Sequence, residues 1–583
     1  MAHHPEGPDA AATIRPAQDH NRAWDHDHDH ERDGDRNPHP HRDRDRDPRS
    51  DHDRDHADAL TMTALLNCLV REVVSPDSDR YDGHRTYRLP TTGHLLRVRA
   101  GRYPHHPALY TPGGWLPLSL DLLVALTAEE LTACTGVSND TLAGEIRHSR
   151  DVVATLLSTR RTLTPSSQPF IEPTELFLRS EQALVAGHRY HPAPKARGGL
   201  GPDAWLPYAP EARARFPLVL LGLAPEIVLE EGDATALDAL GPPPPDGGLL
   251  LPAHPWQLEL LGVPAALRDG RLRNLGETTA IRDGRLRYLG ETAAMAVPTS
   301  SLRTVYLPDV DLFCKFSLDV RITNDVRRLW ARDLRRLTTI DSRLREVFDD
   351  LPAHLPRPSA LSDRGYRTVD LGDGDGGEAL AVVVRDGLGA HLRPGLTALL
   401  AAGISEGFPG NPLDGLDEDR ALAWWQGYLE HVVPPVLHAY LRHGVVLECH
   451  LQNVLVGVDA TGAPAQVIFR DHEGVKLVAD RHPDTAPRVS AAYGWERLVY
   501  CLVTNNLWEI AGAIEERHPG LGGELWARVR DLLAGYAADH LEVRALLAAD
   551  HVPAKANLLL RWLGADGGEM RCVPVPNPLR ART

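Results

Sequence analysis

Two short segments near the C-terminus constrain the fold most strongly, because each joins an apolar strand-like run to a cluster of polar side chains. Residues 448–456 read ECHLQNVLV and residues 467–474 read VIFRDHEG. Apolar runs bounded by turns are typical of buried strands, and a β-hairpin would bring the two polar clusters together. Asn and Asp oxygens are hard ligands suited to a Mg²⁺ that bridges nucleotide phosphates. The alternative is a buried hairpin with solvated ends.

Length and composition bound the class of protein. A chain of 583 residues with 42% hydrophobic residues predicts a globular protein of roughly two to four packed subdomains. The net charge of −17 argues against nucleic acid as the main partner, because a phosphate backbone binds a basic surface. The six cysteines form no CxxC pair, which favours a reducing cytoplasm over a disulfide framework or zinc ribbon. Neither a signal peptide nor a membrane span is expected, because no apolar run is long enough.

The first 58 residues differ from the rest in composition. Residues 25–58 are mostly Asp, His and Arg, and ten of the 29 histidines lie among the first 60 residues. A segment with so few apolar residues cannot offset the entropy of ordering, so we expect residues 1–58 to be disordered and the folded part to begin near Ala59. Such a tail either binds transition metals loosely or only solvates the chain.

A 14-residue repeat lies in the middle of the chain. The sequences RDGRLR and LGET within residues 268–278 recur within residues 282–292. Two copies do not support a solenoid and favour a local duplication in a hairpin or loop.

An upstream group of cations could supply the positive half of a nucleotide site. Arg303, Lys315 and Arg327 recur at intervals of 12 positions, and two serines precede the first of them. We expect Arg303 and Lys315 to face each other across a hairpin, and Arg327 to lie in the first turn of a helix capped by Thr323 or Asn324. Lys315 lies within an apolar strand, and lysine is rarely buried without a partner. The alternative is a set of surface ion pairs.

Three other motifs are weaker when each is taken alone. The loop at residues 187–199 reads GHRYHPAPKARGG and carries enough basic side chains to bind a polycarboxylate, although basic surface loops are common. The motif HPWQ at residues 254–257 is by itself more often packing than chemistry. Lys555 precedes a helix near the end of the chain, and a solvated lysine is the default interpretation.

Taken together, these motifs resemble the IucA/IucC family of NRPS-independent siderophore synthetases. The matching pieces occur in the family's order over about residues 60–580 and read GHRYHPAPKARGG, HPWQ, PTSSLRT, KFSLDVRITNDVR, ECHLQNVLV, RDHEG and PAKANLLLRW. The resemblance implies an α+β fold with a cupped-hand architecture of thumb, fingers and palm, in which the palm is loosely similar to kinase-type folds. We expect the thumb at residues 59–240, the β-rich fingers at residues 241–390 and the helix-rich palm at residues 391–583.

The resemblance also implies an ATP-dependent reaction and the residues that perform it. A carboxylate attacks the α-phosphate of ATP to give an acyl-adenylate and pyrophosphate, and an amine or hydroxyl then displaces AMP to leave an amide or ester. Cations and Mg²⁺ are needed because negative charge accumulates between the carboxylate and the triphosphate. The catalytic residues implied are Lys315, Arg327 and His450. Those implied to contact ATP are Ser301, Arg303, Thr304, Lys315, Arg327, His450, Asn453 and Asp471. Those implied for the acid are His188, His191, Lys195, Arg327, His450 and Lys555. The implied Mg²⁺ ligands are Asn453, Asp471 and Glu473.

The resemblance leaves the second substrate open. The loop at residues 187–199 is similar to that of citrate-type members, which favours citrate or a citryl derivative as the acid. The nucleophile is a diamine, a diamino acid, an amino alcohol or serine, and a homodimer is expected from the family. The chain departs from the family in its N-terminal tail and in the 14-residue repeat.

Two rival functions remain. Glu448 and Asn453 have the spacing of the catalytic Asp and the metal-binding Asn in a kinase loop, with Asp471 as a second metal ligand. That pattern predicts a small-molecule phosphotransferase, although the sequence has no Gly-rich phosphate loop. The other rival is a carrier or metal-binding protein that acts through its His-rich tail, which leaves the internal motifs unexplained.

Overall fold

The structure, a computed structural model, describes most of the chain that follows the N-terminal segment. The described residues are 48–77, 82–163, 171–261, 284–322, 325–370, 376–483, 488–565 and 570–580. Residues 48–583 form one compact unit. The first copy of the repeat lies outside the described residues.

Helix α1 (Pro48–Glu72) corrects the predicted start of the folded part. The expectation of disorder is wrong for residues 48–58, which form the first turns of this helix, and residues 1–47 lie outside the described residues. The polar composition of these residues predicted disorder, but a few tertiary contacts are enough to hold them in the helix. Ala57 is fully buried, and Asp58 forms an ion pair with Arg150 at 2.9 Å.

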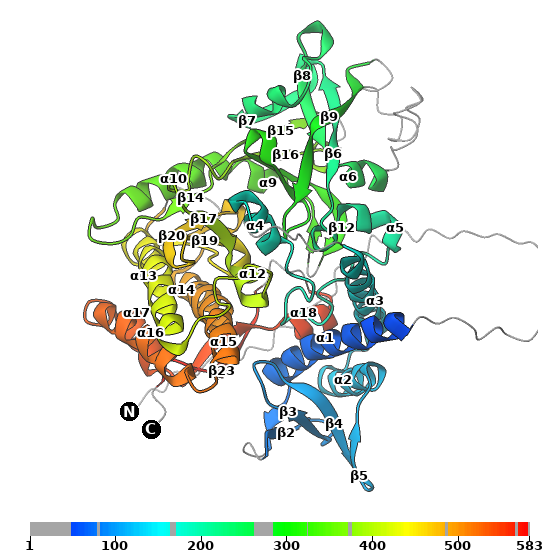
Figure 1. The fold of residues 1–583 in the computed structure, drawn as a ribbon, viewed down its shortest axis with the longest axis vertical. Coiled ribbons are helices and arrows are strands. Elements are labelled where there is room, and N and C mark those ends of the chain that lie inside the picture. The colour runs from blue at the N-terminus through cyan, green and yellow to red at the C-terminus, as the bar shows by residue number, and fades with distance from the viewer. Residues whose placement is uncertain are drawn as a thin grey trace, which may run out of the picture. The chain divides into compact units, whose positions relative to one another are not determined.

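A five-stranded antiparallel sheet and three helices form the first part of the fold (Figure 1). The strands pair in chain order: β1 (Ser75–Pro76), β2 (His84–Arg88), β3 (Leu95–Arg99), β4 (His105–Thr111) and β5 (Gly114–Pro117). The helices are α1, α2 (Leu120–Thr135) and α3 (Asp140–Thr162). The apolar faces of α1 and α2 share one core with the sheet, which includes Leu65, Leu96 and Leu123.

The second sheet has eight strands and is antiparallel throughout. Its order is β7 (Val228–Gly232), β15 (Asp363–Val369), β16 (Val382–Asp386), β11 (Leu312–Phe316), β10 (Thr304–Leu307), β9 (Leu286–Pro298), β6 (Phe216–Leu223) and β8 (Leu249–Ala253). The β10–β11 hairpin pairs Thr304 with Lys315, in the middle of the sheet. This hairpin therefore brings the PTSSLRT and KFSLDV motifs together.

The segment that follows β11 differs from its prediction. Strand β12 (Leu318–Ile322) pairs antiparallel with β13 (Asp325–Arg327), and Arg327 lies opposite Leu318. The expected helix start at Arg327 is therefore wrong, and its proposed caps at residues 323 and 324 lie outside the described residues. Strand pairing and the burial of Leu318 outweigh the local preference for a helix cap.

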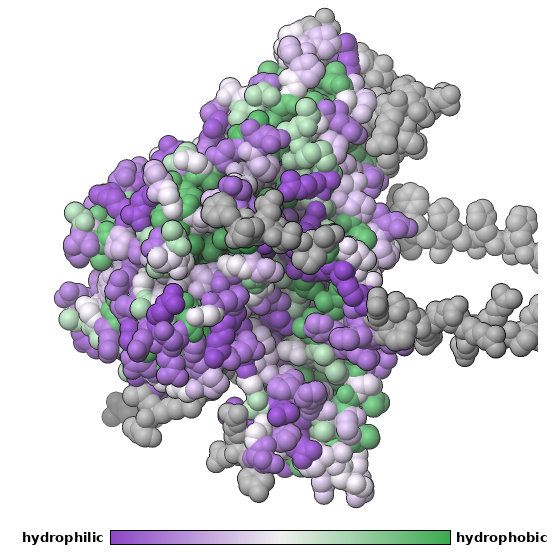
Figure 2. All heavy atoms as spheres, in the orientation of Figure 1, coloured by the Kyte–Doolittle hydropathy of each residue, from purple (hydrophilic) through white to green (hydrophobic). Residues whose placement is uncertain are grey.

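The C-terminal part has a four-stranded sheet covered by helices. The strand order is β14 (Ser359–Ala360), β20 (Pro464–Phe469), β19 (Val454–Val458) and β17 (Thr397–Leu400), and β14 is parallel to β20. The surrounding helices are α10 (Leu337–Asp349), α12 (Ala401–Glu406), α13 (Glu418–His443), α14 (Ala491–Val499), α15 (Trp508–Arg517), α16 (Gly522–Ala537) and α17 (Leu541–Ala548). The core between them contains Trp425, Tyr428 and Val456. On the face shown in Figure 2, side chains over α15 and α16 are mostly hydrophilic.

Short elements complete the described fold. The helices are α4 (Pro173–Glu181), α5 (Pro202–Trp205), α6 (Pro255–Leu260), α9 (Ala331–Leu334), α11 (Gly376–Ala379) and α18 (Asn557–Trp562). The remaining strand pairs are β18 (Val445–Val446) with β21 (Lys476–Leu477), and β22 (His551–Lys555) with β23 (Cys572–Pro576). Among the described helices, none combines the length and the apolar character that a membrane crossing needs.

Candidate functional site

Strands β19 and β20 form the hairpin that the two C-terminal motifs predict. Val454 lies opposite Phe469, and the backbone N–H of Arg470 donates to the carbonyl of Asn453 at 3.1 Å. The polar residues that precede β19 and those that follow β20 therefore lie together at one end of the sheet. His450 stands directly before the short 3-10 helix η7 (Leu451–Asn453) at this end.

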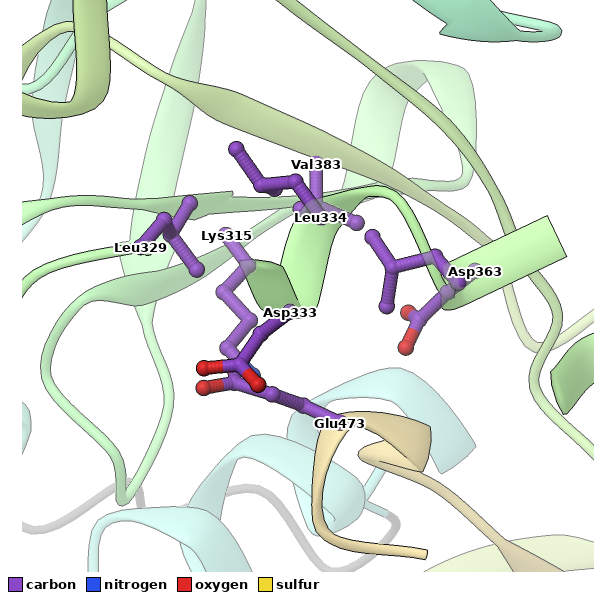
Figure 3. A pocket seen from close by; sticks show the side chains of 8 residues that line it. Lys315, Leu329, Asp333, Leu334, Asp363, Val383 and Glu473 are labelled. Atoms are coloured by element: carbon purple, nitrogen blue, oxygen red, sulfur yellow. The ribbon is translucent and has the colours of Figure 1, made fainter. Parts of the chain in front are cut away.

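Two cations of the eight-stranded sheet meet the carboxylates of this hairpin end. Lys315 forms ion pairs with Asp471 and, at 2.6 Å, with Glu473, while Arg303 lies 3.4 Å from the same Glu473. Arg303 and Lys315 are not opposite each other in the hairpin, because Lys315 pairs with Thr304, but both cations reach the same oxygen of Glu473. Figure 3 shows Lys315, Asp333 and Glu473 with their charged ends turned toward one another. The Lys315 side chain is only 3% exposed, so its charge depends on these partners.

The charges in this cluster keep its carboxylates ionised. Burial raises the pKa of Asp471, but the neighbouring charges of Lys315, Arg385 and Arg303 outweigh burial and hold the pKa well below its usual range. The pKa of Glu473 is also lowered, because Lys315 and Arg303 outweigh burial and the repulsion of Asp471. Two ionised carboxylates are hard oxygen ligands. The residues present therefore fit Mg²⁺, with Asp471 and Glu473 as the groups that would hold it.

The backbone is strained at two points of the site. Asp471 has φ +68° and Leu302, the residue before Arg303, has φ +70°. This left-handed region is uncommon for residues other than glycine and costs a bulky side chain about 1–3 kcal/mol. Both strained residues adjoin the ion-pair cluster, and strain of this kind gathers at functional sites.

Two buried ion pairs, which the sequence analysis missed, lie behind the cluster. Arg385 on β16 binds Asp363 at 2.6 Å and also lies 3.2 Å from Asp471. Arg470 forms an ion pair with Glu181 at the end of α4, and both side chains are buried. Glu181 also accepts the backbone N–H of Ser300 at 3.0 Å and so connects the PTSSLRT turn to the hairpin. Arg385 could have been identified from the sequence in the same way as Lys315, because each is a cation within an apolar strand.

Hydrogen bonds also hold the serine-rich turn and the segment around His450. Ser301 Oγ accepts the backbone N–H of Thr304 at 3.1 Å, and Gln452 Nε2 donates to Ser300 Oγ at 3.3 Å. The PTSSLRT and ECHLQN motifs are therefore in direct contact.

A stretch of π-helix supports the backbone on both sides of His450. It spans Tyr500–Leu507, between α14 and α15. Asn506 Nδ2 donates to the carbonyl of Cys449 at 2.8 Å, and Asn505 Oδ1 accepts the N–H of Leu451 at 3.3 Å. A π-helical segment frequently marks a functional site, and no sequence pattern identified this one.

A second basic group adjoins the ion-pair cluster. Arg303 Nη1 donates to the backbone carbonyl of Arg327 at 3.1 Å, which places β13 beside the cluster. Burial, followed by the charge of Arg303, lowers the pKa of Arg327 to about 10, so Arg327 is still protonated at neutral pH. Burial, followed by the charge of Arg497, lowers the pKa of Lys555, and Arg327 contributes to this effect. Arg327 and Lys555 are therefore electrostatic neighbours.

Two neutral histidines belong to this basic group. Burial lowers the pKa of His450 to about 4, where Asp471 opposes the shift and Lys555 adds to it. The protein atoms packed around His188 and the charge of Lys555 lower its pKa to about 3, although part of its surface is exposed to solvent. Both imidazoles are neutral at neutral pH and can donate one hydrogen bond each without adding charge.

The two other candidates in the 187–199 loop are engaged within the protein. His191 Nδ1 accepts the backbone N–H of Ala193 at 3.1 Å, inside the loop itself. Lys195 forms a buried ion pair with Glu211, which also lies 3.7 Å from Arg197. The structure brings His188 to the basic group but gives Lys195 an internal partner.

The HPWQ motif packs inside the fold, as its default interpretation holds. Trp256 is buried, and Gln257 joins two segments by donating to the carbonyl of Ala379 at 2.9 Å and accepting the N–H of Asp319 at 2.8 Å.

Comparison with known proteins gives two family matches. Residues 176–406 match the model of the IucA / IucC family, and residues 422–570 match the model described as Ferric iron reductase FhuF-like transporter. The first match contains β10, β11 and β13, and the second contains His450, the β19–β20 hairpin and Lys555. The site is therefore built from both matched parts.

Whole-chain relatives agree with the first match. The chain is 28% identical to the rhizobactin siderophore biosynthesis protein RhbC of Rhizobium meliloti, over 88% of this chain and 94% of that protein. It is 26% identical to the L-2,3-diaminopropanoate–citrate ligase of Staphylococcus aureus, over 74% of this chain and 78% of that protein. The fold matches the ATP-bound aerobactin synthetase IucA of Klebsiella pneumoniae with a TM-score of 0.75 at 21% identity, over 90% of this chain and 100% of that one. Over residues 176–406 and in these relatives, the chain is similar to proteins of the IucA/IucC family.

Proposed function

We propose that the chain is a siderophore-biosynthesis ligase that uses ATP to join a citrate-like carboxylic acid to an amine or a hydroxyl. The carboxylate oxygen forms a bond to the α-phosphorus of ATP, and pyrophosphate leaves. The nucleophile then bonds to the acyl carbon, loses its proton, and AMP leaves with the carboxylate oxygen. The names of the curated relatives, which include two citrate ligases and a synthase of a citryl amide, support this reaction.

The observation that carries the proposal is the cluster of Lys315, Arg303, Asp471 and Glu473. Two cations and two ionised carboxylates meet there at the junction of two sheets. A nucleotide with Mg²⁺ is the ligand that needs both signs of charge at one place, because its phosphates bind cations and its metal binds carboxylates. When the nucleotide binds, Lys315 and Arg303 would turn from the carboxylates to phosphate oxygens, and Asp471, Glu473 and Asn453 would hold the metal.

The basic group beside the cluster is suited to the acid. Arg327 supplies positive charge, Lys555 adds an amine whose pKa is lowered by burial, and the neutral His450 and His188 supply hydrogen bonds. A tricarboxylate needs such a mixture. Its anionic groups must be neutralised so that they do not repel the α-phosphate of ATP. We assign Arg327 and His450 to the reacting carboxylate, and His188 and Lys555 to those that remain. Ser301 and Thr304 adjoin the phosphates.

The finer architecture is part of the same proposal. We assign a thumb to residues 59–240, fingers to residues 241–390 and a kinase-like palm to residues 391–583, in a cytoplasmic homodimer. The elements support this division, because helix-covered strands dominate the third segment and the eight-stranded sheet dominates the second.

The proposal is tested by the products of ATP turnover. The purified chain is incubated with ATP, Mg²⁺, citrate and hydroxylamine as a surrogate nucleophile, and pyrophosphate and ADP are both assayed. Citrate-dependent pyrophosphate with a hydroxamate product is the expected result. Citrate-independent turnover, or ADP without pyrophosphate, would contradict it and favour a phosphotransferase. Glu448, which would take the place of the catalytic aspartate in that rival, forms an ion pair with Arg497.

A further inference from the structure

A compact cluster of two histidines and a carboxylate lies where the C-terminal ends of α10 and α13 meet (Figure 1). Asp350 directly follows α10, while His438 and His443 lie near the end of α13. The two histidine Nε2 atoms are 3.3 Å apart. Asp350 Oδ2 lies 2.9 Å from Nε2 of His443 and 3.5 Å from Nε2 of His438. Three ligand atoms therefore converge on one point.

The triangle of these atoms has the size of one face of a tetrahedral metal site. An ion bound at about 2.0–2.1 Å by nitrogen and oxygen keeps its ligand atoms about 3.3 Å apart. The observed separations of 2.9, 3.3 and 3.5 Å scatter around that value. A point at this bonding distance from all three atoms lies about 0.8 Å out of their plane, close to the offset of an ideal tetrahedron. An ion therefore fits without rearrangement of the side chains.

The convergence of the two histidines is a specific feature of this helix end. Residues five positions apart on a regular helix point about 140° away from each other, so His438 and His443 do not share a helix face. They meet because His443 is the last residue of α13, before Gly444 in the left-handed conformation at φ +65°. His482 Nε2 is hydrogen-bonded to the carbonyl of His443 at 2.8 Å and holds this end in place.

The charges around the cluster favour a bound cation. The C-terminal end of a helix carries partial negative charge, and Asp350 adds a carboxylate. The competing cation is Arg442, whose Nε lies 3.8 Å from Asp350 Oδ2. Its side chain is 72% exposed and free to turn into solvent.

We propose that Asp350, His438 and His443 form a binding site for a transition-metal dication of the zinc type. Two imidazoles and one carboxylate are ligands typical of Zn²⁺, and with three protein ligands a water molecule takes the fourth position. The bound ion ties the end of α10 to the end of α13, directly before β18 and the segment that carries His450. This inference does not depend on the proposed ligase function.

The test measures zinc bound by the full chain. Any zinc bound by the histidines among the first 60 residues is equal in all variants and cancels in the comparison. After equilibrium dialysis against Zn²⁺, the unmodified chain should retain one more equivalent than His443→Gln or Asp350→Asn. Loss of a ligand should weaken binding by more than the roughly 10–100-fold that loss of an outer-shell partner costs. The matched control is His431→Gln, because His431 lies on the same helix outside the cluster and should leave zinc binding unchanged.

A second measurement locates the ion. Crystals grown with Zn²⁺ should show an anomalous scattering peak within bonding distance of the three ligand atoms, and the melting temperature of the unmodified chain should rise with zinc more than that of the two ligand variants. Equal zinc stoichiometry in the unmodified chain and both ligand variants, or anomalous peaks only elsewhere, would show that the cluster is a hydrogen-bonded triad without a metal.

Discussion

At the scale of single residues, the charge of Lys315 should be indispensable to the reaction. Lys315→Met leaves Asp471 and Glu473 without their closest cation and removes a donor from the predicted phosphate site. Loss of one preorganised donor to a charged transition state costs about 100–1,000-fold in rate, and we expect at least this loss in citrate-dependent pyrophosphate release. Lys315→Arg keeps the charge with a different shape and should retain part of the rate. A Met variant that is folded by circular dichroism and fully active would remove Lys315 from the site.

Lys195 should act on stability and not on substrate binding. Lys195 and Glu211 are almost fully buried, and breaking such a pair costs about 3 kcal/mol, since Arg197 is left as the remaining partner of Glu211. Lys195→Met should therefore lower the free energy of unfolding in urea while the KM for citrate stays unchanged. The double variant Lys195→Met, Glu211→Gln should be no more stable than the single variant, because it leaves the buried Arg197 without its carboxylate partner. A raised citrate KM in the folded single variant would return Lys195 to the acid site.

At the scale of elements, the first three turns of α1 should be needed for the fold. A chain that begins at Ala59 loses the buried Ala57, the ion pair of Asp58 with Arg150 and that of Asp53 with Arg161. We expect its melting temperature to fall by several degrees, because each kcal/mol lost shifts the melting temperature by about 2–4 °C or less in a chain of this size. The matched control begins at Pro48 and should melt like the full chain. Equal melting of the two truncated chains would contradict the role of these turns.

At the scale of the whole molecule, buried histidines should make stability depend on pH. Burial lowers the pKa of His254 to about 3 and that of His450 to about 4, whereas an imidazole in the unfolded chain titrates near about 6.5. Between these values the unfolded chain binds protons that the folded chain does not. The contribution of each group to the free energy of unfolding is therefore complete above about pH 6.5 and is lost as the pH falls, by at most about 1.4 kcal/mol per pH unit.

His254→Asn isolates one of these contributions. The Asn side chain can still accept the N–H of Trp256, as His254 Nδ1 does at 3.2 Å, but it does not titrate. Urea denaturation at several pH values between about 4 and 6 gives the slope of the unfolding free energy against pH. In the variant this slope should be smaller, by the amount that one proton bound only in the unfolded chain contributes. His551→Asn, at an exposed position, should leave the slope unchanged. Burial raises the pKa of Glu72 to about 7, so this group makes the stability change with pH in the opposite direction to the histidines. Its contribution is the same in the variants and cancels when their slopes are compared.

Sequence alone determined the features that depend on local pattern. The apolar runs around residues 454–458 and 464–469 are long enough and well enough bounded to form only strands, so the hairpin and the proximity of Asn453 to Asp471 followed from them. A lysine in an apolar strand must have a partner, which is why Lys315 was identified as part of the site. The ordered series of motifs indicated the family whose model matches residues 176–406.

The tertiary structure decided the features that depend on partners distant in the sequence. Glu181 pairs with Arg470, 289 positions away in the sequence, and Lys195 pairs with Glu211 inside the fold. No local pattern could show which cation is available to a substrate and which is neutralised by a carboxylate of the protein. The same holds for β13, where pairing with β12 prevails over a helix-capping sequence, and for the triad that joins Asp350 to α13. The physical reason is that local pattern sets the secondary-structure preference of a residue, whereas its charge state and its partner are set by whatever the packed chain brings beside it.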